Sequence, residues 1–177
     1  MGEFRIGRKF AQHSYPEAPR GAGPSGFARN SAFGPQGLTP QALGATGDKI
    51  KWDTIESGGV SGDTAVKITP KVTGIVRALI NVVVENTAGS TNNMIVEPFL
   101  DGSSIGAATI STVDAAFEGN NGFITIPFEL DFAGAQKLSV GVTHTIEVKV
   151  IPQQGGTSTG VLALSSIDLQ ELPAATG

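Results

Sequence analysis

The sequence predicts an all-β protein: an eight-stranded antiparallel jelly roll or β-sandwich that follows an extended, irregular N-terminal arm. β-Branched and aromatic residues gather in short runs after Lys49, and Gly, Asn and Asp separate these runs. No segment of this region has apolar residues at helical spacing. A chain of 177 residues is expected to build one core. We therefore expect an arm over residues 1–47 and a jelly-roll β-domain over residues 48–177.

The first 47 residues contain nine Gly and five Pro, which break regular secondary structure. Such a segment cannot build a core of its own. It nevertheless contains five aromatic side chains, which solvated linkers rarely carry. We interpret it as an arm that becomes ordered when these side chains pack on its own domain or on a neighbouring surface; a disordered tail is the alternative interpretation.

Charge changes at the same boundary. The arm has five Lys or Arg residues and two Glu, a net charge of +3. Because the whole chain has a net charge of −4, the remaining residues carry −7. A basic arm on an acidic domain suits contact with a like domain or with a larger acidic surface. Five cations over 47 residues are too few for a nucleic-acid-binding tail. The arm residues expected to make the contact are Phe4, Arg5, Arg8, Phe10, Tyr15, Arg20, Phe27, Arg29 and Phe33.

Eight strands are expected in the domain, each with β-branched residues and bounded by turn residues. They cover residues 49–56, 64–69, 74–85, 93–100, 104–112, 123–130, 143–151 and 161–171. The dipeptides Asp101-Gly102 and Asn121-Gly122 are signals for two-residue hairpin turns. Two such turns indicate an antiparallel meander.

The residue patterns of two strands indicate how each strand lies in its sheet. In 143–151, Ile146, Val148 and Val150 share one face, which is typical of a half-buried strand. In 123–130, Pro127 cannot donate a ladder hydrogen bond, which favours an edge strand or a bulge.

The strand 74–85 is apolar on both faces. Ala78, Ile80, Val82 and Val84 form a normal core face, and Ile75, Leu79 and Val83 lie on the opposite face. A row of large apolar side chains on an outer face indicates a covered surface. The second sheet or the arm could cover it, but we expect an identical subunit, because the arm and the charge asymmetry also indicate a neighbour.

Few residues suit catalysis or metal binding. The chain has no Cys and only two His, so neither thiol chemistry nor a His-rich metal site is expected. A G-x-S-x-G motif at residues 102–106 precedes Asp114, Asp131 and His144, in the order of an α/β-hydrolase. Its Ser104 follows a hairpin signal and enters a strand, whereas a nucleophile elbow needs a strand-to-helix turn. We therefore expect no enzyme, with His144 as a half-buried, hydrogen-bonded residue.

No metal, cofactor or membrane segment is expected. The acidic residues lack calcium-loop spacing, although a calcium ion shared between subunits near residues 114–118 stays an open alternative. No apolar run has the length of a signal peptide or of a membrane span. The product is therefore expected to be soluble and made in the cytosol.

Several segments resemble a known family. They are KIKWDTIES, ITPKVTGIVRALINVVVE, LSVGVTHTIEVKV and VLALSSIDLQEL. Their strand spacing over about residues 49–172, with a Pro and a Gly before the long apolar strand, resembles C1q/TNF-like jelly rolls. With a Gly/Pro-rich arm in front, the chain is similar to capsid decoration (cement) proteins of tailed bacteriophages.

This resemblance implies a homotrimer on the outer capsid surface of a virion, bound to the major capsid protein, with arms linking neighbouring subunits. The alternative is a receptor- or glycan-binding head, or a structural component, of a phage tail fibre or spike. Loops 86–93 and 153–160 would then contact the ligand, but they contain no Trp or Tyr on which a sugar ring could stack.

Overall fold

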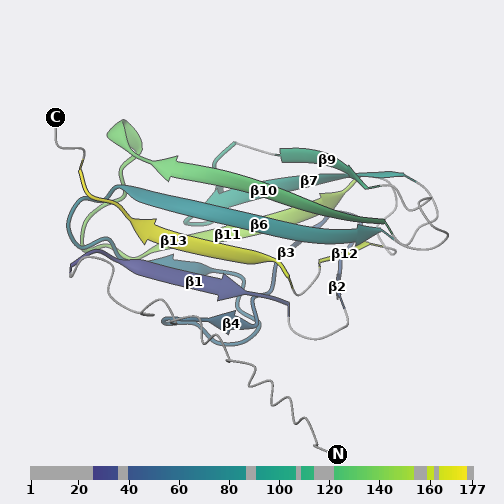
Figure 1. Cartoon of the computed structure of the whole chain (residues 1–177), viewed down its shortest axis with the longest axis horizontal. Helices are drawn as coiled ribbons and strands as arrows, with labels where there is room; N and C mark the ends of the chain where they lie inside the picture. The colour runs from purple at the N-terminus through teal and green to yellow at the C-terminus, as the bar shows by residue number, and fades with distance from the viewer. Residues whose placement is uncertain are drawn as a thin grey trace, which may run out of the picture.

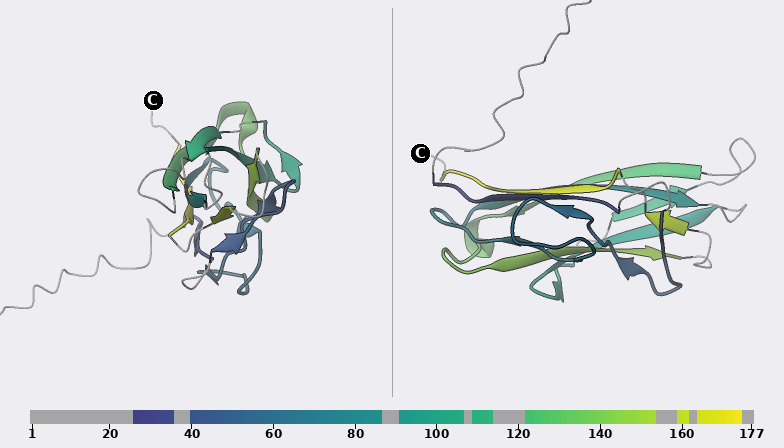
Figure 2. Two further views of the ribbon diagram at one scale, coloured as in Figure 1. Left: turned by 90° about the vertical axis from the view of Figure 1, so that its right-hand side faces the viewer. Right: turned by 90° about the horizontal axis from the view of Figure 1, so that it is seen from below.

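The computed structural model describes residues 26–35, 40–86, 91–106, 109–113, 122–153, 159–161 and 164–174. Within these ranges the chain forms two antiparallel β-sheets, and one short 3₁₀ turn, η2 (Gly134–Gln136), is the only helical element (Figure 1). Figure 2 shows along the strands how the two layers enclose the interior. The all-β prediction is confirmed.

The first sheet, sheet A, contains seven strands among the described residues, in the order β2-β12-β6-β13-β1-β4, with β10 also paired to β6. Its strands are β1 (Arg29–Phe33), β2 (Gln41–Ala42), β4 (Thr54–Ile55), β6 (Val76–Asn86), β10 (Gly122–Phe132), β12 (Thr159–Val161) and β13 (Ser166–Glu171). β12 and β13 pair with successive parts of β6, so they act as one interrupted strand.

The second sheet, sheet B, contains six strands in the described part of the chain, in the order β3-β11-β7-β8, with β5 paired to β11 and β9 paired to β7. They are β3 (Asp48–Lys49), β5 (Val66–Ile68), β7 (Asn92–Leu100), β8 (Ser103–Ser104), β9 (Thr109–Val113) and β11 (His144–Pro152). From β2 to β7 the chain changes sheet at every step, and it changes sheet again from β9 to β10, β10 to β11 and β11 to β12. This alternation is the connectivity of a jelly roll.

Each of the eight expected strands is present, although the expected 49–56, 104–112 and 161–171 are each divided into two short strands. Two strands were not expected. β1 pairs with β13 along its whole length, and β2 pairs with β12. Leu43, which follows β2, is buried in the core. The boundary expected at residue 47 is therefore wrong, because the β-domain already begins near residue 26.

The core lies between the sheets, and the predicted inner faces line it. Ala78, Ile80, Val82 and Val84 of β6 are buried there, opposite Ile146, Val148 and Val150 of β11. Trp52, the single tryptophan of the chain, is fully buried in the same cluster. Its indole Nε1 donates to the carbonyl of Thr64 at 3.2 Å, so the one polar atom of the ring is satisfied.

Two predictions about local geometry are confirmed. Asp101 and Gly102 both have positive φ, 49° and 79°, as a type I′ hairpin turn requires, and they join β7 to β8. β10, which contains Pro127, pairs only with β6 among the described strands and is thus an edge strand. Asn121 of the second expected hairpin lies outside the described residues.

The buried carboxylate of Glu171 ties three segments together at one end of the sandwich. It is 1% exposed and accepts backbone N–H bonds from Ala28, Lys71, Val72, Thr73 and Gly74 at 2.7–3.0 Å. These donors come from the start of β1 and from the loop between β5 and β6. Burial raises the pKa of Glu171, but the backbone donors outweigh it and lower the pKa to about 2.

Candidate functional site

The outer face of sheet A has a shallow apolar depression at its centre. Register places Leu79 of β6 between Glu129 of β10 and Asp168 of β13, and Asn81 between Pro127 and Ser166. The depression has a volume of about 530 Å³. Its lining residues are Leu79, Ile80, Asn81, Pro127, Phe128, Glu129, Ser166 and Asp168. Leu79 is 47% exposed, which is unusual for a leucine in the middle of a central strand.

Ion pairs lie on two sides of this depression. On one side, Nε of Arg77 lies 2.7 Å from a carboxylate oxygen of Glu129 and 3.0 Å from one of Asp131. On the other side, Nη2 of Arg29 lies 3.1 Å from a carboxylate oxygen of Asp168. An apolar centre with a charged rim is the usual composition of a protein-protein interface. Because the rim carries both signs, it can complement another copy of itself.

The three residues expected at a subunit interface differ in their surroundings. Leu79 is exposed, as the interface prediction requires. Ile75 is half-buried and precedes β6. Val83 is only 7% exposed in a single chain, so it offers almost no surface to a partner. Its backbone N–H donates to the hydroxyl of Ser165, which is buried beside it, at 2.9 Å. The expected row of three exposed side chains is therefore reduced to Leu79.

The arm residues fall into two groups. Phe4, Arg5, Arg8, Phe10, Tyr15 and Arg20 lie outside the described residues. Phe27, Arg29 and Phe33 were expected in an extended arm that precedes the β-domain, but they lie within β1 or two residues before it. The β-branched residues that mark the other strands of five or more residues are missing from β1, and this strand exists because its partner β13 provides the ladder.

The hydrolase-like motif does not form a catalytic site among the described residues. Ser104 lies in β8, directly after the hairpin turn, and its hydroxyl donates to the carboxylate of Glu97. Asp114 lies outside the described residues. His144 uses both ring nitrogens in the fold: Nδ1 lies 2.7 Å from Asp101, and Nε2 accepts the backbone N–H of Ser139 at 3.1 Å. No nitrogen of His144 is left to act as a base.

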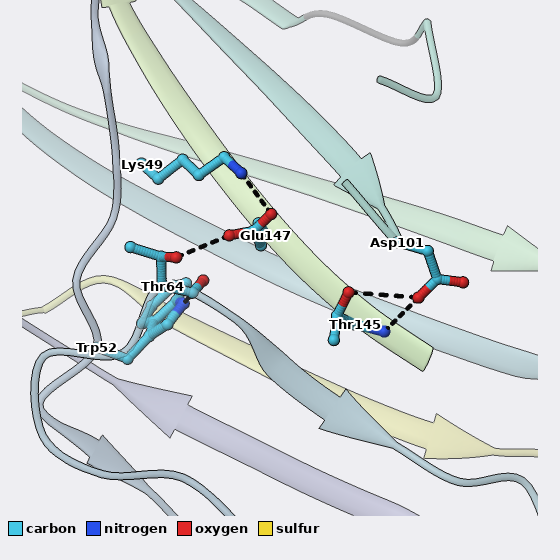
Figure 3. A network of polar contacts seen from close by, with 6 residues as sticks. All are labelled: Lys49, Trp52, Thr64, Asp101, Thr145 and Glu147. Carbon is cyan, nitrogen blue, oxygen red and sulfur yellow. Dashed lines mark hydrogen bonds and ion pairs between the residues drawn. The ribbon is translucent and has the colours of Figure 1, made fainter. Parts of the chain in front are cut away.

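Asp101, the partner of His144, has a structural role at the hairpin. Its carboxylate accepts the backbone N–H of Thr145 at 2.7 Å and the Thr145 hydroxyl at 3.3 Å (Figure 3). Burial raises the pKa of Asp101, but the bonds from Thr145 and His144 outweigh it and lower the pKa below its ordinary value. The carboxylate thus stays ionised and ties the turn to β11.

A second polar network lies on the outer side of β11. Glu147 is nearly buried between the ammonium of Lys49 and the hydroxyl of Thr64, which donates to it at 2.7 Å (Figure 3). The Lys49 ammonium also lies 5.2 Å from the centre of the Phe99 ring, a cation-π distance. Both oxygens of Glu147 are satisfied, so this network joins β3 to β11 and offers no free acid or base.

In the described part of the chain, no group of three or more His, Asp or Glu side chains could hold a metal ion. None of the helical segments described is long and apolar enough to cross a bilayer.

The sequence identified only the contribution of β6 to the outer face of sheet A. Pro127, Glu129 and Asp168 come from β10 and β13, and their place beside Leu79 depends on strand register. The alternation of 123–130 already placed Pro127 and Glu129 on the face opposite the core. The sequence did not show that β10 and β13 are the strands beside β6.

Comparisons with known proteins add little beyond the fold. No protein-family model matches the sequence, and no curated protein matches it either. Among solved structures, Eiger TNF from S. frugiperda is similar to this chain at 13% identity, with a TM-score of 0.38. The similarity covers 86% of this chain and 96% of that one. A similarity of this extent supports no functional argument, and the jelly-roll assignment rests on the strand pairing described above.

Proposed function

We propose that this chain is a non-catalytic structural protein that assembles as a homotrimer through the outer face of sheet A and decorates the outer surface of a viral capsid. The observation that carries the proposal is Leu79, exposed in an apolar depression and framed by ion pairs. An exposed leucine at the centre of a sheet costs solvation free energy unless a partner covers it.

A second copy of the chain is the partner that this face fits best. The rim offers Arg77 and Arg29 as well as Glu129, Asp131 and Asp168, so copies arranged around a threefold axis can set the cations of one copy against the carboxylates of the next. A strongly acidic partner would be repelled by the three carboxylates, and a strongly basic partner by the two Arg side chains. The chain has no cysteine with which to link subunits covalently, so association would rest on this packing.

The capsid role rests on the segment before the domain. Residues 1–25 contain four Lys or Arg and two Glu, a net charge of +2, together with Phe4, Phe10 and Tyr15. Because the whole chain has a net charge of −4, the remaining residues carry −6. A segment of ~25 extended residues spans on the order of 80 Å, enough to cross a subunit boundary. In this proposal it binds the major capsid protein and neighbouring trimers.

The alternative function, a receptor- or glycan-binding head of a tail fibre or spike, stays a hypothesis. Residues 87–90 and 154–158 of the two loops expected to contact the ligand lie outside the described residues.

Deletion of residues 1–25 tests the capsid role. Because β1 begins at Arg29, this cut leaves every described strand intact, whereas a cut at residue 45 would remove β1 and β2. The truncated protein should keep the emission of buried Trp52 and its oligomeric mass, yet fail to bind capsids assembled without it. A matched variant, Arg5→Glu with Arg8→Glu and Arg20→Glu, should lose capsid binding in the same way. Capsid binding at full affinity by the truncated protein would contradict the proposal.

A further inference from the structure

A large groove opens at the side of the sandwich, away from the outer face of sheet A. Its volume is about 1030 Å³. It lies between β1 of sheet A, which is next to the short edge strand β4, and β5, which is at the edge of sheet B. Its lining includes Phe27, Phe33, Glu56, Lys67, Lys71 and the Thr69/Thr143 pair.

Side-chain hydrogen bonds fix the walls of this groove. The buried amide of Asn30 donates to the carbonyls of Ser57 and Lys67 at 2.8 and 2.7 Å, and accepts the N–H of Ser57 at 3.0 Å. One side chain thus joins β1, β5 and the loop after β4. The backbone of Lys71 is held in turn by Glu171 at 2.8 Å. The groove is therefore a built feature of the fold, with its shape set before any ligand binds.

The groove is positively charged although the domain is acidic. Arg29, Lys67 and Lys71 line it, against Glu56 alone. Arg29 is paired with Asp168, but within the described residues neither Lys67 nor Lys71 takes part in an ion pair. Both lysines are exposed. Two unpaired ammonium groups in one groove of an acidic domain are suited to an anionic ligand.

Polar and aromatic groups lie beside these charges. The hydroxyls of Thr69 and Thr143 are 2.8 Å apart. Their mutual bond uses one of the two hydroxyl protons, which leaves the other proton and several lone pairs for a ligand. Phe33 is 50% exposed, and Phe27 is half-buried. A flat apolar ring next to hydroxyl and ammonium groups suits a ligand with both apolar C–H faces and many hydroxyls.

Three other classes of occupant fit less well. The segment of residues 1–25 is itself basic and would be repelled. A nucleic acid strand carries one phosphate per roughly 3.4 Å, and Glu56 together with the small number of cations opposes it. An acidic peptide added to β1 would need free backbone acceptors, but the carbonyls of Ser31 and Phe33 already accept N–H bonds from Glu56 and Asp53.

We propose that this groove binds an acidic oligosaccharide, a sugar chain that carries carboxylate or sulfate groups. Lys67 and Lys71 pair with the anionic groups, Thr69, Thr143 and Glu56 bond the sugar hydroxyls, and Phe33 packs on a ring face. The groove shares Arg29 with the rim of the proposed association surface, but the proposed ligand contacts do not include Arg29, so the two proposals are tested independently.

Calorimetric titration of the full-length chain tests the site. The probes are a heparin-derived hexasaccharide, hexagalacturonate, neutral maltohexaose, a single-stranded DNA oligonucleotide and hexaglutamate. The test variant is Lys67→Glu with Lys71→Glu. The matched control, Lys51→Glu with Lys137→Glu, makes the same change of net charge at exposed lysines outside the groove lining. All four side chains are exposed, so both variants should keep the thermal stability of the parent.

At least one of the two acidic hexasaccharides should bind, and maltohexaose should not. The groove variant should bind the acidic hexasaccharide at least about tenfold more weakly than the parent, and the control variant less than about threefold more weakly. This comparison also separates the groove from the basic N-terminal segment, which is the same in both variants. The proposal is overturned if neither acidic hexasaccharide binds, if the control weakens binding as much as the groove variant, or if DNA or hexaglutamate binds as tightly.

Discussion

Glu171 and Ala28 are joined by hydrogen bonds in both directions. The N–H of Ala28 donates to the carboxylate of Glu171 at 2.9 Å, and the N–H of Glu171 donates to the carbonyl of Ala28 at 2.8 Å. The two residues are 143 positions apart in sequence. The same carboxylate fixes the backbone of Lys71. One buried charge therefore sets both the point where the N-terminal segment enters the domain and one wall of the basic groove.

Replacement of this charge should make the domain less stable. In Glu171→Gln the amide nitrogen faces backbone donors that the carboxylate accepted, and the charge that strengthened the remaining bonds is lost. The folded pKa of about 2 lies below the ordinary 4.5, so the stabilisation is complete above about pH 4.5 and is lost as pH falls toward 2. The shift corresponds to about 3 kcal/mol.

Urea unfolding of both proteins at pH 7 and near pH 3 measures this effect. The free energy of unfolding of the parent should fall on acidification. Glu171→Gln should be less stable than the parent at pH 7, and its free energy of unfolding should fall less between pH 7 and pH 3. Glu56→Gln, at an exposed glutamate, serves as the control and should behave like the parent. An equal acid loss in the parent and in Glu171→Gln would show that Glu171 is not the titrating group responsible.

Asn30→Asp should be strongly destabilising. One carboxylate oxygen would replace the amide nitrogen and face the carbonyls of Ser57 and Lys67, which need a donor. We expect a loss of about 3 kcal/mol or more in the free energy of unfolding. Asn93→Asp makes the same chemical change at an exposed residue whose Oδ1 only accepts a bond, from Thr112. That control should change stability by less than about 0.5 kcal/mol. Similar losses in both variants, by thermal or urea unfolding, would argue against the role given to Asn30.

Gly74→Ala tests the close approach at the entry to β6. Gly74 has a φ of 68°, and a Cβ there would lie 2.1 Å from the carbonyl oxygen of Leu138. Gly58 has nearly the same φ, 71°, but nothing lies within 4 Å of its Cβ position. Gly58→Ala should therefore cost only the left-handed backbone strain, about 1–2 kcal/mol. Gly74→Ala should cost that strain and a steric clash, about 4 kcal/mol or more in total. Equal losses would show that the backbone at Gly74 can move away.

The sequence was most informative where side-chain alternation and turn chemistry agree. Ile146, Val148 and Val150 point inward as their spacing indicates, and Asp101-Gly102 forms the expected hairpin turn. These features are local, since each depends on neighbours in sequence.

Features that depend on distant pairing could not be predicted. β1 has the sequence RNSAF, with no β-branched residue, and is a strand because it pairs with β13 at the other end of the chain. Val83 has the parity of an outer-face residue, but the distant Ser165 lies against its backbone and the side chain is buried. Lys67 and Lys71 stand out only when β5 is placed beside β1 to form the groove.

The molar mass in solution tests the central claim, self-association through the outer face of sheet A. We compare the parent with Leu79→Lys and with Ile110→Lys, which alters a 68% exposed isoleucine on β9 of sheet B. Lysine at position 79 lies between Glu129 and Asp168, so the fold should tolerate it. By light scattering after size exclusion, the parent and Ile110→Lys should have three times the chain mass of 18.1 kDa, and Leu79→Lys should have that of one chain. A parent that elutes as a single 18.1 kDa chain, or a Leu79→Lys variant that stays trimeric, would contradict the claim.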